Sequence, residues 1–147
     1  MAEDGGVKVS YSDDVEASWT VRGKQPHYGY KVHMGTDVYR GFVLGGHMTA
    51  AHISDSVELE TLVDELRLPD GSAVLAYKGY AGQKNQAVLE ARGLKNGIMG
   101  KAWRNRPLSK RSKARSLLIR KLRYVVEQGF GTLKRHYGFG RARYLGR

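Results

Sequence analysis

Glu127 is a carboxylate in a strongly basic part of the sequence, with no other acidic residue between Gly93 and the C-terminus. Arg120 lies seven residues before it, Arg123 four residues before it and Lys134 seven residues after it. On a helix with about 100° per residue, these four side chains fall within one narrow stripe. Such a stripe is typical of a surface ion pair between Arg123 and Glu127. It is also how a metal-binding carboxylate would be set among phosphate contacts.

Other common catalytic and metal-binding patterns are missing from the sequence. There is no cysteine, and the five histidines show neither an HExxH motif nor paired zinc spacing. Gly100-Lys101 lacks the upstream glycine and the following Ser or Thr of a phosphate-binding loop. The sequence therefore indicates no small-molecule cofactor.

The charge of the chain changes sign near its middle. Residues 1–70 hold twelve Asp and Glu against six Lys and Arg, a net charge of −6. Residues 71–147 hold two against nineteen, a net charge of +17, and the whole chain carries +11. A basic half of this density would attract the phosphate backbone of a nucleic acid, although a solvated basic face is the plainer alternative. No apolar run approaches the roughly eighteen residues of a membrane span, and the acidic N-terminus does not resemble a secretory signal.

The densest basic run is predicted to contact the phosphate backbone, and a flexible, solvated loop is the alternative. Its members are Arg104, Arg106, Lys110, Arg111, Lys113 and Arg115. If they bind phosphate, neutralising several of them should flatten the salt dependence of binding.

Apolar and polar residues alternate along three short segments of the acidic half, which predicts strands. The first is Val7–Tyr11, and a loop containing Gly23 and Pro26 follows it. A short turn then joins Tyr28–His33 to Phe42–Met48, so these two strands are predicted to form a hairpin.

A helix and buried strands are predicted next. The helix begins at Asp55–Glu58, which has the spacing of a capping box. Its buried face is predicted from apolar residues at helical spacing, which are Leu59, Leu62, Val63 and Leu66. The continuous apolar run Ala73–Tyr77 indicates a buried strand. Asn85 is predicted to cap a short helix that ends at Gly93, and Gly97–Met99 to form another strand.

The last predicted element is one long helix from about Lys113 to His136, which carries Glu127. Its apolar face consists of Ile119, Leu122, Val126, Phe130 and Leu133. Gly129 and Gly131 interrupt it at roughly 1 kcal/mol each relative to alanine, so we expect a kink or local irregularity there. The order of strands and helices predicts a mixed α/β domain.

Several motifs occur in order over about residues 11–147. They are Trp19 with Gly29–His33, Ala50–Ser56, Ala76–Ala81, Arg104–Leu108, Val126–Lys134, and Tyr137-Gly138 with Arg143–Gly146. The set resembles the transposases of the bacterial insertion-sequence family five, within the wider family-four-like DDE group, in a truncated copy. The family's Arg-x3-Glu-x6-Lys signature is intact at Arg123, Glu127 and Lys134, whereas Arg120 stands where the family often has tyrosine.

The resemblance implies a domain similar to ribonuclease H, with a mixed sheet and flanking helices. In that family two aspartates and a glutamate hold Mg²⁺ or Mn²⁺ ions for DNA strand cleavage and transfer. Glu127 matches the third acid and would be a metal ligand. Tyr77 stands where the family has its second aspartate. A phenol is neutral at pH 7 and offers the metal no charge, so the resemblance implies a copy that has lost its catalysis.

The first aspartate of the family lies on the opening strand, upstream of the segment that resembles Ser12–Trp19. We expect that strand to precede the start of this chain. The alternative is that Val7–Tyr11 fills its place and presents Asp13 or Asp14 as the first acid. If nothing fills the place, the hairpin and the next buried strand have unpaired edges between them. Residues 1–147 are therefore expected to form a single, partial catalytic domain.

The resemblance also implies the partners and the location. DNA at the ends of an insertion element is the expected partner, in the bacterial cytoplasm, together with a second copy or a full-length transposase. Further DNA contacts are expected from Lys78, Arg120, Arg123 and Lys134. The alternative function is a non-enzymatic DNA-binding protein, or an inhibitor of an active transposase. A general RNA-binding module has only the charge in its favour.

Overall fold

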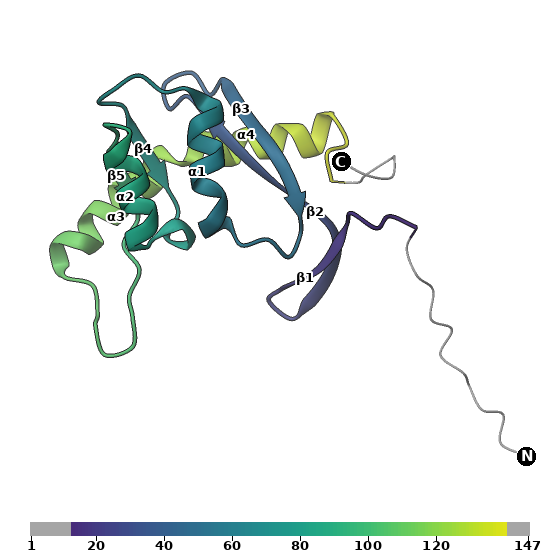
Figure 1. The fold of residues 1–147 in the computed structure, drawn as a ribbon, viewed down its shortest axis with the longest axis horizontal. Helices are drawn as coiled ribbons and strands as arrows, with labels where there is room; N and C mark the ends of the chain where they lie inside the picture. Colours follow the sequence, from purple (N-terminus) through teal and green to yellow (C-terminus); the bar gives the residue numbers. More distant parts are fainter. Residues whose placement is uncertain (1–12, 141–147) are drawn as a thin grey trace, which may run out of the picture.

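The computed structural model describes residues 13–140, which form a mixed α/β fold with two small sheets (Figure 1). The strands are β1 (Ser18–Arg22), β2 (Gln25–Thr36), β3 (Val43–Ala50), β4 (Ala73–Ala76) and β5 (Lys95–Ile98). The helices are α1 (Asp55–Leu66), the 3₁₀ turn η1 (Lys78–Tyr80), α2 (Gln83–Ala91), α3 (Lys110–Leu122) and α4 (Tyr124–His136). The predicted mixed α/β class is confirmed, and the predicted strand Val7–Tyr11 lies outside the described residues.

The predicted hairpin is present as β2 and β3, which pair antiparallel from Tyr30 opposite Ala50 to Thr36 opposite Val43. The prediction of a loop around Gly23 and Pro26 was wrong. β1 pairs antiparallel with the first part of β2, from Ser18 opposite Gly29 to Arg22 opposite Gln25. Gly23 makes the tight turn possible because its φ of 67° is in the left-handed region.

α1 packs its predicted apolar face into the main core. Leu59, Leu62 and Val63 are buried, as expected from their helical spacing. The core cluster joins two of them to Ala76 of β4, Leu89 of α2, Leu94 just before β5 and Ile98 of β5. The predicted cap was one residue late, because Ser54 is the N-cap and accepts from the backbone N–H of Ser56, while Asp55 is the first helical residue.

β4 and β5 are parallel neighbours connected through η1 and α2. They confirm the two predicted strands with shifted ends, but only Ala76 of β4 is buried, so the prediction that this whole segment is buried was wrong. Asn85 does not cap α2, because the helix begins at Gln83 and Asn85 lies buried within its first turn. Its amide instead donates to the carbonyl oxygens of Ser56 and Tyr80 at 2.9 and 2.8 Å. It therefore ties the start of α1 to the end of η1.

The single long helix predicted at the C-terminal end is two helices. α3 ends at Leu122 and α4 begins at Tyr124, so the break falls at Arg123 and not at Gly129 or Gly131. α3 contacts β4 and β5, whereas α4 contacts β2. The break therefore lets the two halves follow two different sheets. Among residues 13–140, no helix is long and apolar enough to cross a bilayer.

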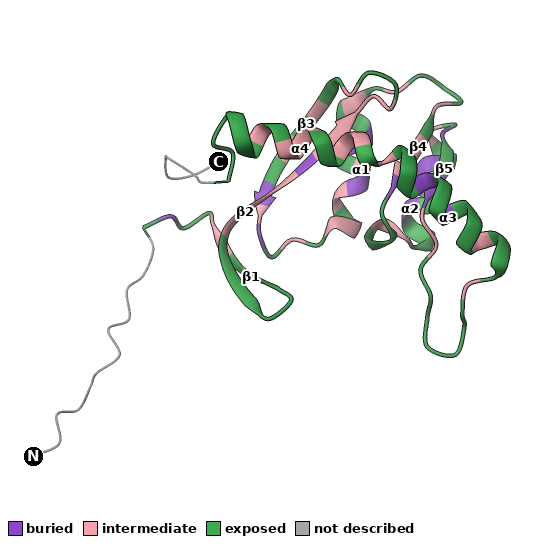
Figure 2. Ribbon diagram, turned by 180° about the vertical axis from the view of Figure 1, so that it is seen from behind, coloured by how far each residue is buried: buried purple, intermediate pink, exposed green. Residues whose placement is uncertain are grey.

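The two sheets are separate and are bridged by helices. α1 contacts β2 and β3 on one side, and Figure 2 shows α3 and α4 crossing the opposite side. Within the described part of the chain, β4 pairs with β5 alone, and Tyr30–Thr36 of β2 pair with β3 alone. Among the described residues, this part of β2 and the strand β4 therefore each keep one side without a strand partner.

Candidate nucleic-acid interface

Tyr77 lies directly after β4, at the point where the chain turns into η1. Its side chain is 44% exposed. The Lys78 ammonium and the Arg123 guanidinium each lie 5.5 Å from the centroid of its ring. The ring therefore joins a cation from its own segment to a cation from the junction of α3 and α4 by cation–π contacts.

η1 holds this arrangement in place. The Tyr80 N–H donates to the Tyr77 carbonyl at 3.0 Å, and Asn85 fixes the Tyr80 carbonyl from α2. The Tyr80 side chain is largely buried, and this burial, with a smaller effect of Asp55, raises its pKa to about 12. Tyr80 therefore contributes a neutral phenol beside Arg123 at any physiological pH.

Asp55 is a carboxylate that lies beside η1. A Cβ added to Gly79 would lie 4.0 Å from its Oδ2 atom. Asp55 already pairs with Lys31 of β2 at 3.0 Å, and the Lys31 ammonium also donates to the Ile53 carbonyl at 2.7 Å. Sequence reasoning assigned Asp55 only to helix capping. Its place in the Ala50–Ser56 motif was the signal that could have drawn attention to it.

Glu127 lies exposed in the first turn of α4, one helical turn after Arg123. The surface ion pair with Arg123 does not form in the described residues, because the Arg123 guanidinium lies over the Tyr77 ring instead. Residues 13–140 contain no group of three His, Cys, Asp or Glu side chains placed to hold a metal ion. With a tyrosine at position 77 and Asp55 paired to Lys31, the described donor set does not fit a Mg²⁺ or Mn²⁺ site.

The two candidates for the first acid lie elsewhere. Asp14 is buried, and its Oδ1 atom accepts from the Tyr30 hydroxyl at 2.7 Å and from two backbone N–H groups of the turn before β1. Asp13 is exposed beside it. In both views the coloured segment that leads into β1 lies well away from β4.

The predicted phosphate contacts divide into two groups. Arg104 and Arg106 are exposed on the loop between β5 and α3, which projects from the body of the molecule in Figure 1. Five further predicted contacts are exposed on α3 and α4, namely Lys110, Arg111, Lys113, Arg120 and Lys134. Arg115 differs because its guanidinium donates to the carbonyl oxygens of Ile98 and Asn96, which ties α3 to β5.

The tip of that loop is an ordered turn. Trp103 and Arg106 exchange two backbone hydrogen bonds, and Asn105 has a φ of 62°. The Trp103 ring is 60% exposed, with the Lys101 ammonium 4.7 Å from its centroid. Sequence reasoning missed this aromatic side chain, although its position amid the basic run could have indicated it.

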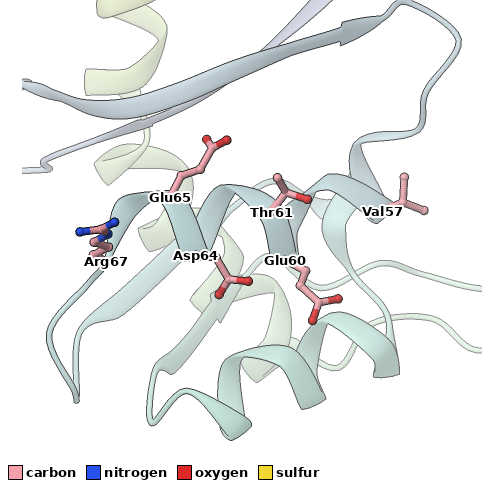
Figure 3. Close-up of a pocket in the computed structure, with 6 residues that line it drawn as sticks. All are labelled: Val57, Glu60, Thr61, Asp64, Glu65 and Arg67. Atoms are coloured by element: carbon pink, nitrogen blue, oxygen red, sulfur yellow. The ribbon is translucent and has the colours of Figure 1, made fainter.

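An acidic surface lies on the outer side of α1. Figure 3 shows an open hollow there, lined by Val57, Glu60, Thr61, Asp64, Glu65 and Arg67. Arg92 of α2 pairs with Asp64 at 2.6 Å and with Glu60 at 3.2 Å, and its hydrogen bond lowers the pKa of Asp64. The hollow contains none of the predicted site residues, and its negative charge would repel a nucleic acid.

Nearly all of the chain matches a known family of proteins. It matches the model of the transposase DDE domain family over residues 6–147, so it belongs to that family. It is 40% identical, over 146 residues, to a transposase for insertion sequence element IS1106 from Neisseria meningitidis serogroup B. That match covers 98% of this chain and 50% of the relative, so the chain spans about half the length of this curated protein. No solved structure matches the chain.

Proposed function

We propose that this chain binds the DNA of an insertion element in the manner of a transposase but does not cut it. The observation that carries the proposal is Tyr77, which stands after β4 between two cations, where the family resemblance expects an aspartate. Metal-dependent strand cleavage needs clustered oxygen ligands with negative charge. A phenol beside Arg123 and Lys78 supplies none.

We further propose that the domain has a ribonuclease-H-like arrangement with one strand unfilled. The open edges of β2 and β4 support this, because a strand placed between them would join the two sheets into one. The first acid would come from that strand. Asp13 and Asp14 are the alternative, and the contacts of Asp14 with Tyr30 and the turn before β1 favour a structural role for it.

DNA would lie across the basic side of the molecule. The exposed cations of the projecting loop and of the start of α3 support this, since the phosphate backbone supplies most of the affinity of such contacts. Arg104, Arg106, Lys110, Arg111 and Lys113 are the contacts that we propose there. Lys78, Arg120, Arg123, Glu127 and Lys134 would face the DNA nearer to the end of β4. Element DNA as the partner places the protein in the bacterial cytoplasm.

Mobility-shift titrations test the binding part of the proposal. The purified chain should bind a duplex from the ends of its element more tightly than a scrambled duplex of equal length, and should bind an RNA duplex more weakly than either. Equal, weak binding to all three would contradict it. Tight binding to the RNA duplex would instead support a general RNA-binding module.

A second candidate function is inhibition of an active transposase by mixed assembly. The open edges of β2 and β4 favour it, because an unpaired strand edge is a template for pairing with another chain. Co-expression with a full-length transposase of the same element should then lower the transposition frequency. A variant with proline at Val32, within the open part of β2, should lose this effect while still binding DNA. Inhibition that survives in this variant would exclude the edge of β2 as the contact.

A further inference from the structure

A hairpin arm, residues 18–29, consists of β1, a two-residue turn and the first part of β2, and it extends away from the body of the molecule (Figure 1). Trp19 and Val21 point to one face of β1, and Tyr28 lies opposite Trp19 with the two ring centroids 5.2 Å apart. Val21 is 68% exposed and Trp19 64%, whereas the polar Thr20 on the other face is half-buried. The apolar face of the arm is thus the one that the described residues leave uncovered.

The outer edge of β1 has no strand partner among residues 13–140, where β1 pairs with β2 alone. The two-residue turn makes Arg22 and Gln25 a hydrogen-bonded pair, and such pairs alternate with non-hydrogen-bonded ones along an antiparallel ladder. Trp19 and Val21 therefore direct their backbone N–H and C=O groups to the outer edge. Pro26, which lacks an N–H, lies opposite Val21 and fits this alternation. The edge thus offers two donors and two acceptors to a further strand.

The base of the arm is held by hydrogen bonds to other segments. The Tyr28 hydroxyl donates to the Asp14 carbonyl, and the Tyr30 hydroxyl donates to Asp14 Oδ1 at 2.7 Å. The backbone N–H of His52 donates to Ser18 Oγ at 2.9 Å. These contacts tie the arm to the turn before it and to the loop after β3, so an ordered element presents the edge.

We propose that the outer edge of β1 pairs with the same edge of a second copy of this chain, antiparallel and about a twofold axis at Thr20. In this register Trp19 exchanges both backbone hydrogen bonds with Val21 of the partner subunit, and the symmetry repeats the exchange, so all four groups are paired. An aromatic side chain directly opposite a β-branched one is a favourable cross-strand pair. The two arms then form one four-stranded sheet with a continuous apolar stripe.

The charge of the arm favours a second copy over DNA as the occupant. The arm and the turn before it, residues 13–29, contain three acidic and two basic residues, a net charge of −1, whereas the chain carries +11. A nearly neutral arm does not attract phosphate, and two basic chains can approach there with little repulsion. One short strand buries less than the roughly 1,200 Å² of a stable complex, so the dimer should be weak and dissociate on dilution.

Disulfide cross-linking tests the register, because the full chain contains no cysteine. Thr20→Cys places a thiol at the twofold axis, in a non-hydrogen-bonded pair whose Cα atoms lie about 4.5 Å apart, within the range of a disulfide. Lys24→Cys, exposed at the tip of the same arm, is the matched control. With copper phenanthroline as the oxidant, Thr20→Cys should form a covalent dimer about tenfold faster than Lys24→Cys, whose two copies would lie beyond the roughly 7 Å limit.

Two substitutions at Val21 test the edge itself. Val21→Pro removes the N–H directed to the outer edge and spares the ladder between β1 and β2. Combined with Thr20→Cys, it should lower the cross-linking rate to that of Lys24→Cys. Val21→Thr keeps the N–H and the β-branched shape, so it should not. Circular dichroism verifies that each variant is folded. Sedimentation velocity without these cysteines should show dimer growing with concentration in the wild type and not in Val21→Pro.

The opposite results overturn the inference. Equal cross-linking of Thr20→Cys and Lys24→Cys contradicts it, as does cross-linking that survives Val21→Pro. A wild-type chain that stays monomeric at every concentration, with no cross-linking of Thr20→Cys, contradicts it as well. If Val21→Pro instead weakens DNA binding and Thr20→Cys does not cross-link, the edge belongs to DNA. The cross-linking assay contains no DNA, so its outcome and that of the proposed function are independent.

Discussion

The Arg123 guanidinium lies 5.5 Å from the centroid of the Tyr77 ring and so connects the junction of α3 and α4 to the end of β4. Arg123 is also the residue at which the C-terminal helix breaks in two. The contact therefore joins the part of the molecule that carries Glu127 to the segment that follows β4.

This contact should contribute to stability. We expect a coupling free energy of about 0.5–1 kcal/mol between Tyr77 and Arg123, the size of a cation–π contact at a partly exposed site. The measurement is a double-mutant cycle in urea with Tyr77→Ala, Arg123→Ala and the double variant. Strict additivity of the two single changes would show that the contact contributes nothing.

The core around α1, α2 and β5 should dominate folding. Leu89 is fully buried, so Leu89→Ala should lower the free energy of unfolding by about 2–5 kcal/mol. Leu118 of α3 is 64% exposed, and Leu118→Ala should change the free energy of unfolding by less than about 0.5 kcal/mol. Urea unfolding of the two variants makes the comparison. Similar losses in both would mean that α3 is covered in solution.

Stability should fall as the pH drops below about 6.5, and His33 should be one cause. His33 is buried in β2 and bonded to Thr49, and burial, with the neighbouring His47, lowers its pKa from 6.5. The unfolded chain therefore takes up the proton first, so the free energy of unfolding decreases until the folded-state pKa is passed. The other charged groups that act on His33 are Lys31, Asp55 and Glu58.

Urea unfolding between pH 7.5 and 5 tests this dependence. His33→Gln should show a shallower decrease than the wild type, by at most about 1.4 kcal/mol per pH unit. His136→Gln, an exposed change on α4, is the matched control and should follow the wild-type curve. A His33→Gln curve parallel to the wild type would exclude His33 as a source of the pH dependence.

Arg104 and Arg106 should act in DNA binding, whereas Arg115 should act in the stability of the fold. Arg104→Gln with Arg106→Gln should reduce the slope of log affinity against log salt by roughly 0.9 for each lost phosphate contact, with little change in stability. Arg115→Gln should do the reverse. It leaves the Asn96 and Ile98 carbonyls without their donor, at a cost of about 1–3 kcal/mol, and keeps the salt slope. Salt titrations of DNA binding and urea unfolding of both variants make the comparison. A change in the slope of log affinity against log salt in Arg115→Gln alone would contradict these two roles.

The local patterns of sequence were sufficient to predict most elements. Each of these patterns describes one face of an element or one apolar segment. They are the alternation in Tyr28–His33 and Phe42–Met48, the helical spacing of Leu59, Leu62 and Val63, and the apolar run before Tyr77. Each depends on burial alone, which the residue types reveal. β1 was missed because Gly23 and Pro26, two residues typical of loops, lie three positions apart and made the segment look like a loop, although Pro26 belongs to β2.

The position of the helix break could not be predicted from sequence. The apolar stripe from Ile119 to Leu133 is continuous, and the glycines within it are the weakest helix formers. The break occurs at Arg123 because α3 and α4 pack on different sheets, which is a tertiary effect. The four-residue spacing of Arg123 and Glu127 suggested an ion pair within one helix. In the structure Arg123 instead contacts Tyr77, which follows β4, and this tertiary contact could not be read from the spacing.

The residues of the candidate site could be selected from the sequence only where they belong to the family motifs. Tyr77, Lys78 and Arg123 were all selected from those motifs, and the structure places them together. The pairing of Asp55 with Lys31, and the engagement of Asp14 by Tyr30, depend on contacts between distant segments. Spacing along one chain carries no information on such contacts.

The central claim is that this chain binds element DNA and does not cut it, and Mn²⁺-dependent nicking of supercoiled plasmid tests it most directly. The proteins are the wild type, Tyr77→Asp, and Tyr77→Asp combined with Glu127→Gln, each first shown to be folded and to bind DNA. We predict that none of them nicks, because the described residues bring no second carboxylate to position 77 that could hold a metal ion together with Glu127. Nicking by Tyr77→Asp that Glu127→Gln abolishes would show that the chain holds a first acid, with Asp13 and Asp14 as the candidates. Nicking by the wild type itself would contradict the account.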